Sequence, residues 1–230
     1  MEKIEPLFDR KIQCPLCETN YTSKKIRSKC IQVQEYDTDF CPKYKEGSIN
    51  GLLYKIYVCP SCGYAFSNDF SKYFPPNSKE NIISSICSKW IPHSFSGERT
   101  VEESIKTYKL AVLSATYKKE KHSLIAGLLL RIAWLNRLTK NEEQEKRFMK
   151  LAFQEYNQSF STDDYKGTKI SDVKILYLMA DLSRRIGDIE QATKYLSMVI
   201  ERSKSSIETG IIEMAKERWN EIREQKKVVL

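Results

Sequence analysis

Two short cysteine pairs limit what the first part of this chain can fold into. The pairs are Cys14-Pro15-Leu16-Cys17 and Cys59-Pro60-Ser61-Cys62, each with two residues between its cysteines. This spacing lets both thiolates of a tight turn face one metal ion, and two such turns supply four sulfur ligands. We therefore expect a closed structural metal site formed by Cys14, Cys17, Cys59 and Cys62.

Zinc is the metal that four thiolates most often bind, and we expect it here. Iron is the alternative, because Cys62-Gly63-Tyr64 resembles a rubredoxin knuckle and iron accepts the same four-sulfur geometry. Redox chemistry of the thioredoxin type is less favoured, since that motif normally occurs once and here it occurs twice. The segment between the pairs, Glu18 to Val58, is longer than the roughly 15–20 residues of a compact zinc ribbon, and we expect one long hairpin or a three-stranded extension in it.

The composition is that of a folded chain without membrane segments. The 230 residues are 41% hydrophobic and 30% charged. Met1 to Lys11 contains no apolar segment of the kind found in secretory signals. Leu124 to Leu135 is interrupted by Arg131 and is shorter than the roughly 20 residues that span a bilayer. An odd number of cysteines, seven, suits a metal site in a reducing compartment, so we expect a cytoplasmic protein.

The sequence pattern divides near Pro75, which predicts two domains in an α+β, mostly α, fold. Residues 1–75 are expected to form a small zinc-ribbon-like β module, with strands at Lys25–Tyr36 and Leu52–Val58. Residues 76–230 are expected to form a helical bundle, beginning with a helix over Lys79–Trp90. Apolar residues spaced by three and four predict further helices within 101–115, 124–135, 148–156, 173–186, 189–200 and 207–222.

One predicted helix pair resembles a tetratricopeptide repeat. Gly187-Asp188 would form the turn between its helices, and Ala180, Ala192 and Val199 lie at offsets that allow close packing. A weaker copy near Leu129 has Lys140 where the turn glycine would be. An unrelated helical bundle remains the alternative, because alanine and glycine are common in helical hairpins.

Basic residues in the first strand raise the possibility of nucleic-acid binding. The formal net charge is +8. Aromatic residues among basic ones can stack bases. The candidates are Lys24, Lys25, Arg27 and Lys29, with Tyr21 beside them. A solvated basic surface is the competing interpretation.

Asp37, Asp39 and Cys41 lie in one turn and define an enzymatic alternative. Two carboxylates this close could act as acid and base or hold a cation. Aspartates in turns more often cap their own backbone, and we expect Arg27 to pair with one of them. Cys41 is open to a role as a ligand or a reactive thiol, whereas Cys30 and Cys87 are expected to be small buried residues.

The rest of the chain offers no catalytic set. His93 and His122 each lack a second histidine or cysteine at ligand spacing, and His122 is expected to be exposed. There is no glycine-rich phosphate loop, no G-x-S-x-G and no H-E-x-x-H.

The runs CPLCETNYTSKKIRSK, EYDTDFCPKY and LLYKIYVCPSCGYAF make the chain resemble an uncharacterised bacterial family found mainly in Firmicutes. Its members join such a cysteine-rich segment to a helical, tetratricopeptide-like tail. The resemblance implies that the four knuckle cysteines are shared, together with Arg27, Asp37, Asp39, Phe40 and Tyr44. Gly51 departs from it, because a proline is expected there in relatives. The family brings no activity with it.

These observations predict a non-catalytic zinc-binding adaptor that holds a protein or peptide partner through its helices. The alternatives are a nucleic-acid-binding protein that uses the basic strand, and an enzyme with its site at the Asp37/Asp39/Cys41 turn.

Overall fold

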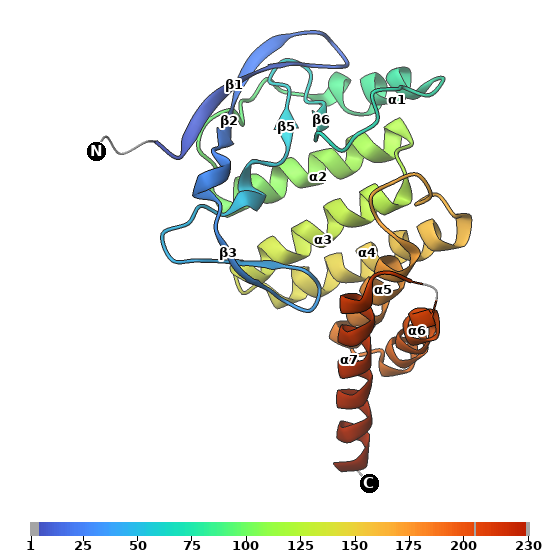
Figure 1. The fold of residues 1–230 in the computed structure, drawn as a ribbon. Helices are drawn as coiled ribbons and strands as arrows, with labels where there is room; N and C mark the ends of the chain where they lie inside the picture. The colour runs from blue at the N-terminus through green and yellow to red at the C-terminus, as the bar shows by residue number, and fades with distance from the viewer. Residues whose placement is uncertain (1–4, 205, 229–230) are drawn as a thin grey trace.

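The computed structural model describes residues 5–204 and 206–228. Its N-terminal part contains three two-stranded antiparallel sheets (Figure 1). They pair β1 (Leu7–Gln13) with β2 (Asn20–Ile26), β3 (Val33–Tyr36) with β4 (Pro42–Tyr44), and β5 (Tyr57–Val58) with β6 (Ala65–Phe66). The remainder is helical, which confirms the predicted mostly helical α+β fold.

The helices of the described residues follow one another along the chain, with a long connection between α1 and α2 and short ones between α2, α3 and α4 and between α5 and α6. They are α1 (Ser78–Ser85), α2 (Val101–Lys118), α3 (His122–Leu138), α4 (Glu142–Thr162), α5 (Asp172–Ile186), α6 (Ile189–Glu201) and α7 (Thr209–Val228). Side-chain caps explain several of the starts. Thr100 and Glu103 form a capping box at α2, and Asn141, Ser171 and Asp188 accept backbone N–H groups at α4, α5 and α6.

The two predicted strands are shorter than expected, and the sequence contains the reasons. The first, Lys25–Tyr36, is interrupted by the 3-10 turn η1 (Ser28–Cys30), which begins directly after the last cross-strand bond, from Arg27 N–H to Pro6 O. In the second, Leu52–Val58, the Asn50 side chain accepts the Leu52 N–H at 2.9 Å and starts the 3-10 helix η2 (Gly51–Tyr54). Only β5 remains extended there. The local cap therefore overrides the β propensity of this apolar run.

The predicted helix over Lys79–Trp90 also ends early. The α-helical part stops at Ser85, and the 3-10 turn η3 (Cys87–Lys89) follows it. Trp90 then continues in an extended conformation. This places its ring beside the cysteine pairs, as described below.

A single large hydrophobic cluster joins the β segments to the helices. It contains Cys41, Leu52, Val58 and Ala65 as well as the inward faces of α2 to α7. A second, smaller cluster surrounds the cysteines and includes Ile82 and Ile86 from α1 and η3. The apolar face predicted for residues 124–135 is buried, with Leu128, Ile132 and Leu135 at most 4% exposed. Burial of side chains of this size stabilises the fold by about 1.5–3 kcal/mol each.

A buried arginine connects the loop before α2 to the β segments. Arg99 is 6% exposed, and its guanidinium donates to the carbonyl oxygens of Phe95, Leu53 and Ile56. Burial lowers its pKa below the usual range.

In the described part of the chain, no helix is both long enough and apolar enough to cross a membrane.

The turn between α5 and α6 depends on the positive φ of Gly187, which is +94°. A Cβ there would meet no atom within 4 Å, so only the backbone conformation opposes a side chain. Gly187→Ala is expected to lower the free energy of unfolding by about 1–2 kcal/mol in urea titrations. Gly97→Ala, which also meets open space but has no positive φ, should change it by less than about 0.5 kcal/mol. Equal losses at the two positions would contradict this account.

Candidate metal centre

The two cysteine pairs form knuckles with the same backbone hydrogen bonds. Glu18 N–H donates to Cys14 O at 2.9 Å, and Gly63 N–H donates to Cys59 O at 2.9 Å. Both residues after the second cysteine have positive φ, 62° at Glu18 and 74° at Gly63. One knuckle joins β1 to β2 and the other joins β5 to β6, so the cysteines connect two separate sheets.

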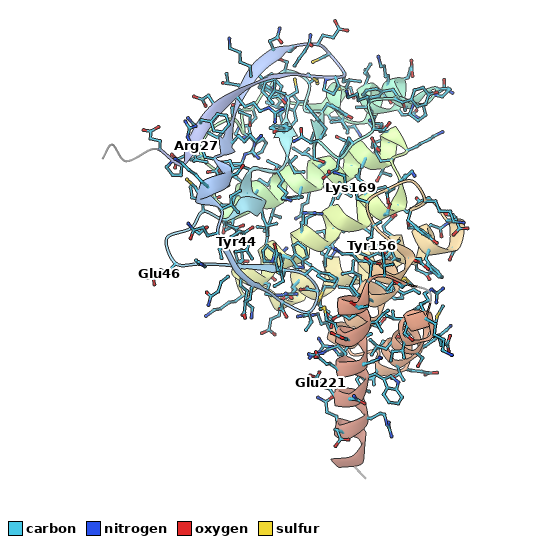
Figure 2. The ribbon with its side chains drawn as sticks, in the orientation of Figure 1. Arg27, Tyr44, Glu46, Tyr156, Lys169 and Glu221 are labelled. Carbon is cyan, nitrogen blue, oxygen red and sulfur yellow. The ribbon has the colours of Figure 1, made fainter. Side chains whose placement is uncertain are left out.

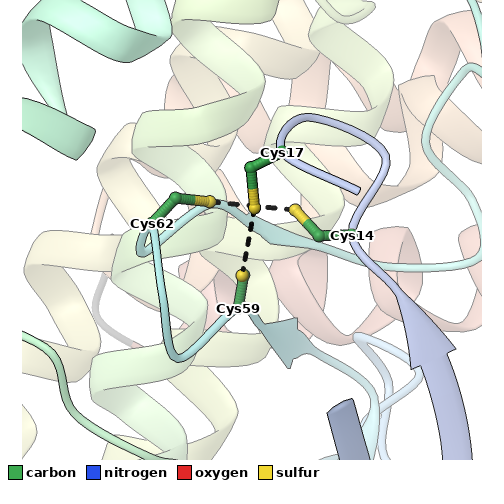
Figure 3. Close-up of side chains that lie close together, drawn as sticks. All are labelled: Cys14, Cys17, Cys59 and Cys62. Carbon is green, nitrogen blue, oxygen red and sulfur yellow. Dashed lines mark hydrogen bonds between the residues drawn. The ribbon is translucent and has the colours of Figure 1, made fainter. Parts of the chain in front are cut away.

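Figure 3 shows that the four thiols point toward one another from the two knuckles. The Sγ atoms of Cys14 and Cys62 are 3.7 Å apart, those of Cys17 and Cys59 are 3.6 Å apart, and all four lie within 4.8 Å of one another. Zinc bound tetrahedrally at about 2.3 Å from sulfur requires about 3.8 Å between sulfurs. The four cysteines, hereafter the cysteine cluster, could therefore hold one metal ion.

The cluster is buried on one side. Cys14 and Cys59 are fully buried, whereas Cys17 is exposed. The hydrogen bond from Cys62 lowers the pKa of Cys14 to about 5, while burial raises that of Cys59 to about 11. Backbone N–H groups of Leu16 and Cys17 also favour the Cys14 thiolate. Such knuckle amides stabilise charge on metal-bound sulfur.

Trp90 covers the second knuckle, and the sequence pattern did not reveal this. Its Nε1 donates to Pro60 O at 2.9 Å. A Cβ on Gly63 would lie 2.5 Å from the indole ring, so only glycine fits beneath it. Fully buried Tyr64 and half-buried Tyr21 pack around the cluster with Ile82.

The other three cysteines lie outside the group of four. Cys41 is 6% exposed, and burial raises its pKa to about 12, so the thiolate is strongly disfavoured. Cys30 and Cys87 are half-buried rather than buried. Cys87 packs against the cluster, and burial raises its pKa.

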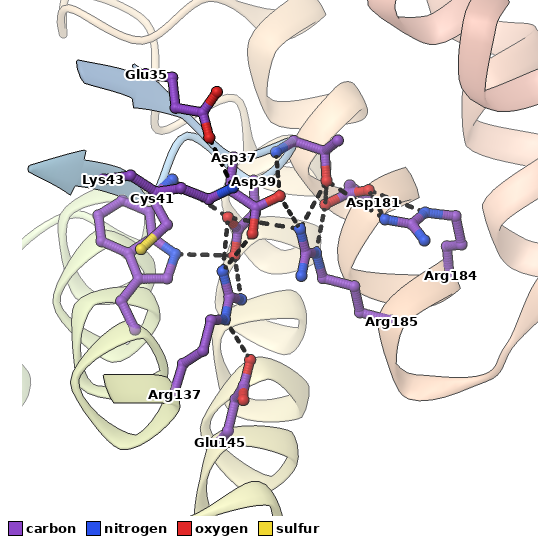
Figure 4. Close-up of polar contacts among 12 residues, drawn as sticks. Glu35, Asp37, Asp39, Cys41, Lys43, Arg137, Glu145, Asp181, Arg184 and Arg185 are labelled. Carbon is purple, nitrogen blue, oxygen red and sulfur yellow. Dashed lines mark hydrogen bonds and ion pairs between the residues drawn. The ribbon is translucent and has the colours of Figure 1, made fainter. Parts of the chain in front are cut away.

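The turn that carries Asp37 and Asp39 is docked on the helices by ion pairs (Figure 4). Asp39 is fully buried and accepts hydrogen bonds from Arg137 Nη2 at 2.6 Å and from Trp134 Nε1 at 2.9 Å. Asp37 pairs with Arg137 at 3.0 Å and with Arg185 at 2.7 Å. The prediction that Arg27 pairs with one of these aspartates is wrong. Its Nε donates instead to Glu5 O, just before the start of β1.

Thr38 adds a third attachment between the two aspartates. Its hydroxyl donates to Asp181 Oδ2 at 2.9 Å and accepts from Arg185 Nη2 at 2.7 Å. Asp181 is itself paired with Arg184 and Arg185 of α5. These contacts, which we call the hairpin latch, consist of Asp37, Thr38, Asp39, Arg137, Asp181, Arg184 and Arg185.

The latch changes the interpretation of the enzymatic alternative. Every carboxylate of the turn is engaged by arginine, and the Cys41 thiol is buried with a raised pKa. Their arrangement is that of buried ion pairs which position a hairpin.

The residues proposed for nucleic-acid binding are not gathered on one stacking surface. Tyr21 packs against the cysteine cluster, and Lys24 pairs with Asp9 at 3.1 Å. The Arg27 guanidinium, labelled in Figure 2, lies 5.0 Å from the centre of the Phe8 ring.

The histidines take no part in either cluster. His122 is half-buried, and its Nδ1 lies 2.6 Å from Glu155 Oε2. His93 is exposed and packs edge-on against Phe95.

The knuckles and the helical region together define a cysteine-rich, mostly helical protein class, and comparison with known proteins places the chain in a family. Residues 7–222 match the family described as "Uncharacterized protein conserved in bacteria (DUF2225)", and the chain belongs to this family. This confirms the resemblance to an uncharacterised bacterial family, whereas a distribution mainly in Firmicutes stays a prediction.

One similar curated protein comes from Borreliella burgdorferi and is described as an uncharacterized protein. It is 28% identical over 167 residues, which are 64% of this chain and 59% of that protein. The chain thus spans less than two thirds of the relative's length. No solved structure matches the chain.

Removal of the buried latch carboxylate should be costly. Asp39→Ala leaves the buried Trp134 Nε1 unpaired and removes one carboxylate from Arg137, which keeps Asp37 and Glu145, so we expect the free energy of unfolding to fall by about 2 kcal/mol or more. Asp9→Ala is the matched control, because Asp9 pairs with Lys24 on the surface and should cost less than about 1 kcal/mol. Both are measured by urea denaturation. A loss at Asp39 no larger than that at Asp9 would contradict the latch.

The latch should also weaken in acid. Burial would raise the pKa of Asp37, but the Thr38 N–H and the guanidinium groups of Arg185 and Arg137 outweigh it and hold that pKa below the ordinary value. A lowered folded-state pKa contributes stability that is present above about pH 4 and is lost as the pH falls through the folded-state value. Wild type should therefore exceed Asp37→Asn in stability at neutral pH, with a difference that shrinks in acid. Unfolding titrations across this range measure it, and a difference that grows in acid would overturn the account.

Proposed function

We propose that the chain is a non-catalytic adaptor whose cysteine cluster binds one structural zinc ion. The observation that carries the metal assignment is the set of four thiols with separations of 3.6 and 3.7 Å between the paired sulfurs. Four protein ligands fill a tetrahedral shell, so such a site has no position for a substrate. Cys14, Cys17, Cys59 and Cys62 would each supply one thiolate.

A zinc ion in this position would stabilise the fold by cross-linking. It would hold the β1–β2 ribbon against β5 and β6, which the large hydrophobic cluster ties to the helices. Structural zinc contributes directly to folding free energy in small β modules. We propose that residues 1–75 form this zinc-ribbon-like module and that residues 76–230 form the helical part.

The adaptor assignment rests on the helical part. Helices α5 and α6 form an antiparallel pair around Gly187, with fully buried Ala180 and Ala192 at their contact. This arrangement supports a tetratricopeptide-like hairpin, and stacked hairpins of that kind present extended binding surfaces. In this proposal the zinc module positions a second surface next to the helices, in a cytoplasmic protein.

Metal analysis tests the zinc site. The full-length chain is expected to carry one zinc per chain by elemental analysis and to be colourless, whereas an iron site would be coloured. Cys14→Ser should lose most of the metal and lower the thermal midpoint, because it removes one of four ligands. Cys30→Ser, outside the cluster, should retain the metal. Equal metal content in the Cys14→Ser variant and the wild type would refute the site.

Partner recovery tests the adaptor role separately. Affinity purification of the tagged full-length chain from its native lysate, with cross-linking, is expected to yield a stoichiometric protein partner. Recovery of no such partner would count against the adaptor, and it would leave the zinc assignment untouched.

A further inference from the structure

A large groove lies between the β3–β4 hairpin and helices α3 and α5, away from the cysteine cluster. Its volume is about 1010 Å³, at the upper end of the roughly 300–1,000 Å³ of ligand sites. Tyr36 and Tyr44 of the hairpin and Leu128 of α3 line its sides. Tyr44, Tyr156 and Lys169, labelled in Figure 2, mark three of the segments that surround it.

The lining carries an excess of positive charge. Its cations without a carboxylate partner among the described residues are Lys55, Lys121, Arg131, Lys169 and Lys174. Of its acids, Asp39 is paired with Arg137, and Glu120 is paired with Lys118 at 2.6 Å. Asp69 is thus the remaining carboxylate of the lining. Charge complementarity favours an anionic occupant.

Arg131 of α3 lines the groove and lies over the ring of Trp134. Its Nη1 donates to Gly127 O at 2.6 Å, but its buried Nε has no partner in the described structure. Desolvation and then the charge of Arg131 lower the pKa of nearby Lys55, and the carboxylate of Asp69 only partly opposes this shift. A carboxylate placed between them would satisfy both.

Uncharged polar and apolar side chains complete the lining, and the apolar ones restrict the kind of anion. Ile31, just before β3, is 37% exposed, and Tyr36 of the hairpin is 64% exposed. The aromatic rings deeper in the groove are already engaged, because Arg131 lies over Trp134 and Lys174 lies 4.4 Å from the centre of the Phe40 ring. Two rings of the groove are therefore covered by cations, and exposed apolar side chains beside further cations suit a peptide.

We propose that this groove binds a peptide segment of a partner protein in which carboxylate side chains stand next to aliphatic or aromatic ones. The proposal rests on the adaptor function and names the chemistry of the partner. Carboxylates would bind Lys55 and Arg131, and apolar side chains would pack on the hairpin.

Selection from a display library of random dodecapeptides against the immobilised full-length chain tests the proposal. The selected sequences are expected to be enriched in Asp and Glu beside apolar residues. A labelled selected peptide should bind in fluorescence anisotropy, with an affinity that falls as salt is added.

Two charge-reversal variants locate the binding. Lys55→Glu/Arg131→Glu should weaken the peptide by about tenfold or more, since both partners of the carboxylates become repulsive. Lys169→Glu/Lys174→Glu, at the α5 end of the groove, should weaken peptide binding as well. This second variant provides the test if the first one fails to fold. Lys146→Glu/Lys150→Glu is the matched control, because it makes the same charge change on the exposed side of α4. The control should retain wild-type affinity within about twofold. Equal thermal midpoints would show that all variants are folded.

Four outcomes would overturn the proposal. One is selection of peptides without acidic enrichment, and another is equal binding by the folded groove variants and the control. The third is a single-stranded RNA dodecamer that binds the wild type and not the groove variants while no peptide binds. A partner recovered from lysate that binds the groove variants normally would refute the groove and leave the adaptor function intact.

Discussion

The buried ion pair between Asp39 and Arg137 is the contact on which the arrangement of the N-terminal half depends. Asp39 is fully buried, and a charge in that position is tolerated only with a partner of opposite sign. The pair fixes the tip of the β3–β4 hairpin on α3, and Arg185 extends the attachment to α5. The hairpin can then place Cys41 in the main hydrophobic cluster and form one wall of the groove.

The cysteine cluster and the hairpin latch attach different parts of the chain by different means. The cluster connects the β1–β2 ribbon to β5 and β6, with Trp90 closing it from the side of α1. The latch connects the β3–β4 hairpin to α3 and α5. The smaller hydrophobic cluster surrounds the cysteines, and the larger one contains Cys41 of the hairpin that the latch holds. Loss of metal would therefore loosen the ribbon more than it loosens the groove.

The sequence was sufficient for features that depend on local spacing. Paired cysteines predicted the cluster, and residues spaced by three and four predicted the helices with errors of a few positions at their ends. It was insufficient where partners are far apart along the chain. Arg27 is close to Asp37 in sequence, but the arginines that pair with Asp37 are Arg137 and Arg185, which are 100 and 148 residues away. The Asn50 cap and the ring of Trp90 over Gly63 also depend on geometry that periodicity does not encode.

The separation of 148 residues between Asp37 and Arg185 has a consequence for synthesis. At about 5–20 residues per second, Asp37 is synthesised roughly 7–30 s before Arg185 is made. The cysteine cluster needs only the segment up to Cys62, so its ligands are complete much earlier. During that interval the nascent chain carries a closed knuckle pair beside an undocked hairpin with unpaired acids. The hairpin latch of the newborn chain can therefore close only once α5 has been made, and a chain truncated before that helix would keep the four cysteines without a docked hairpin.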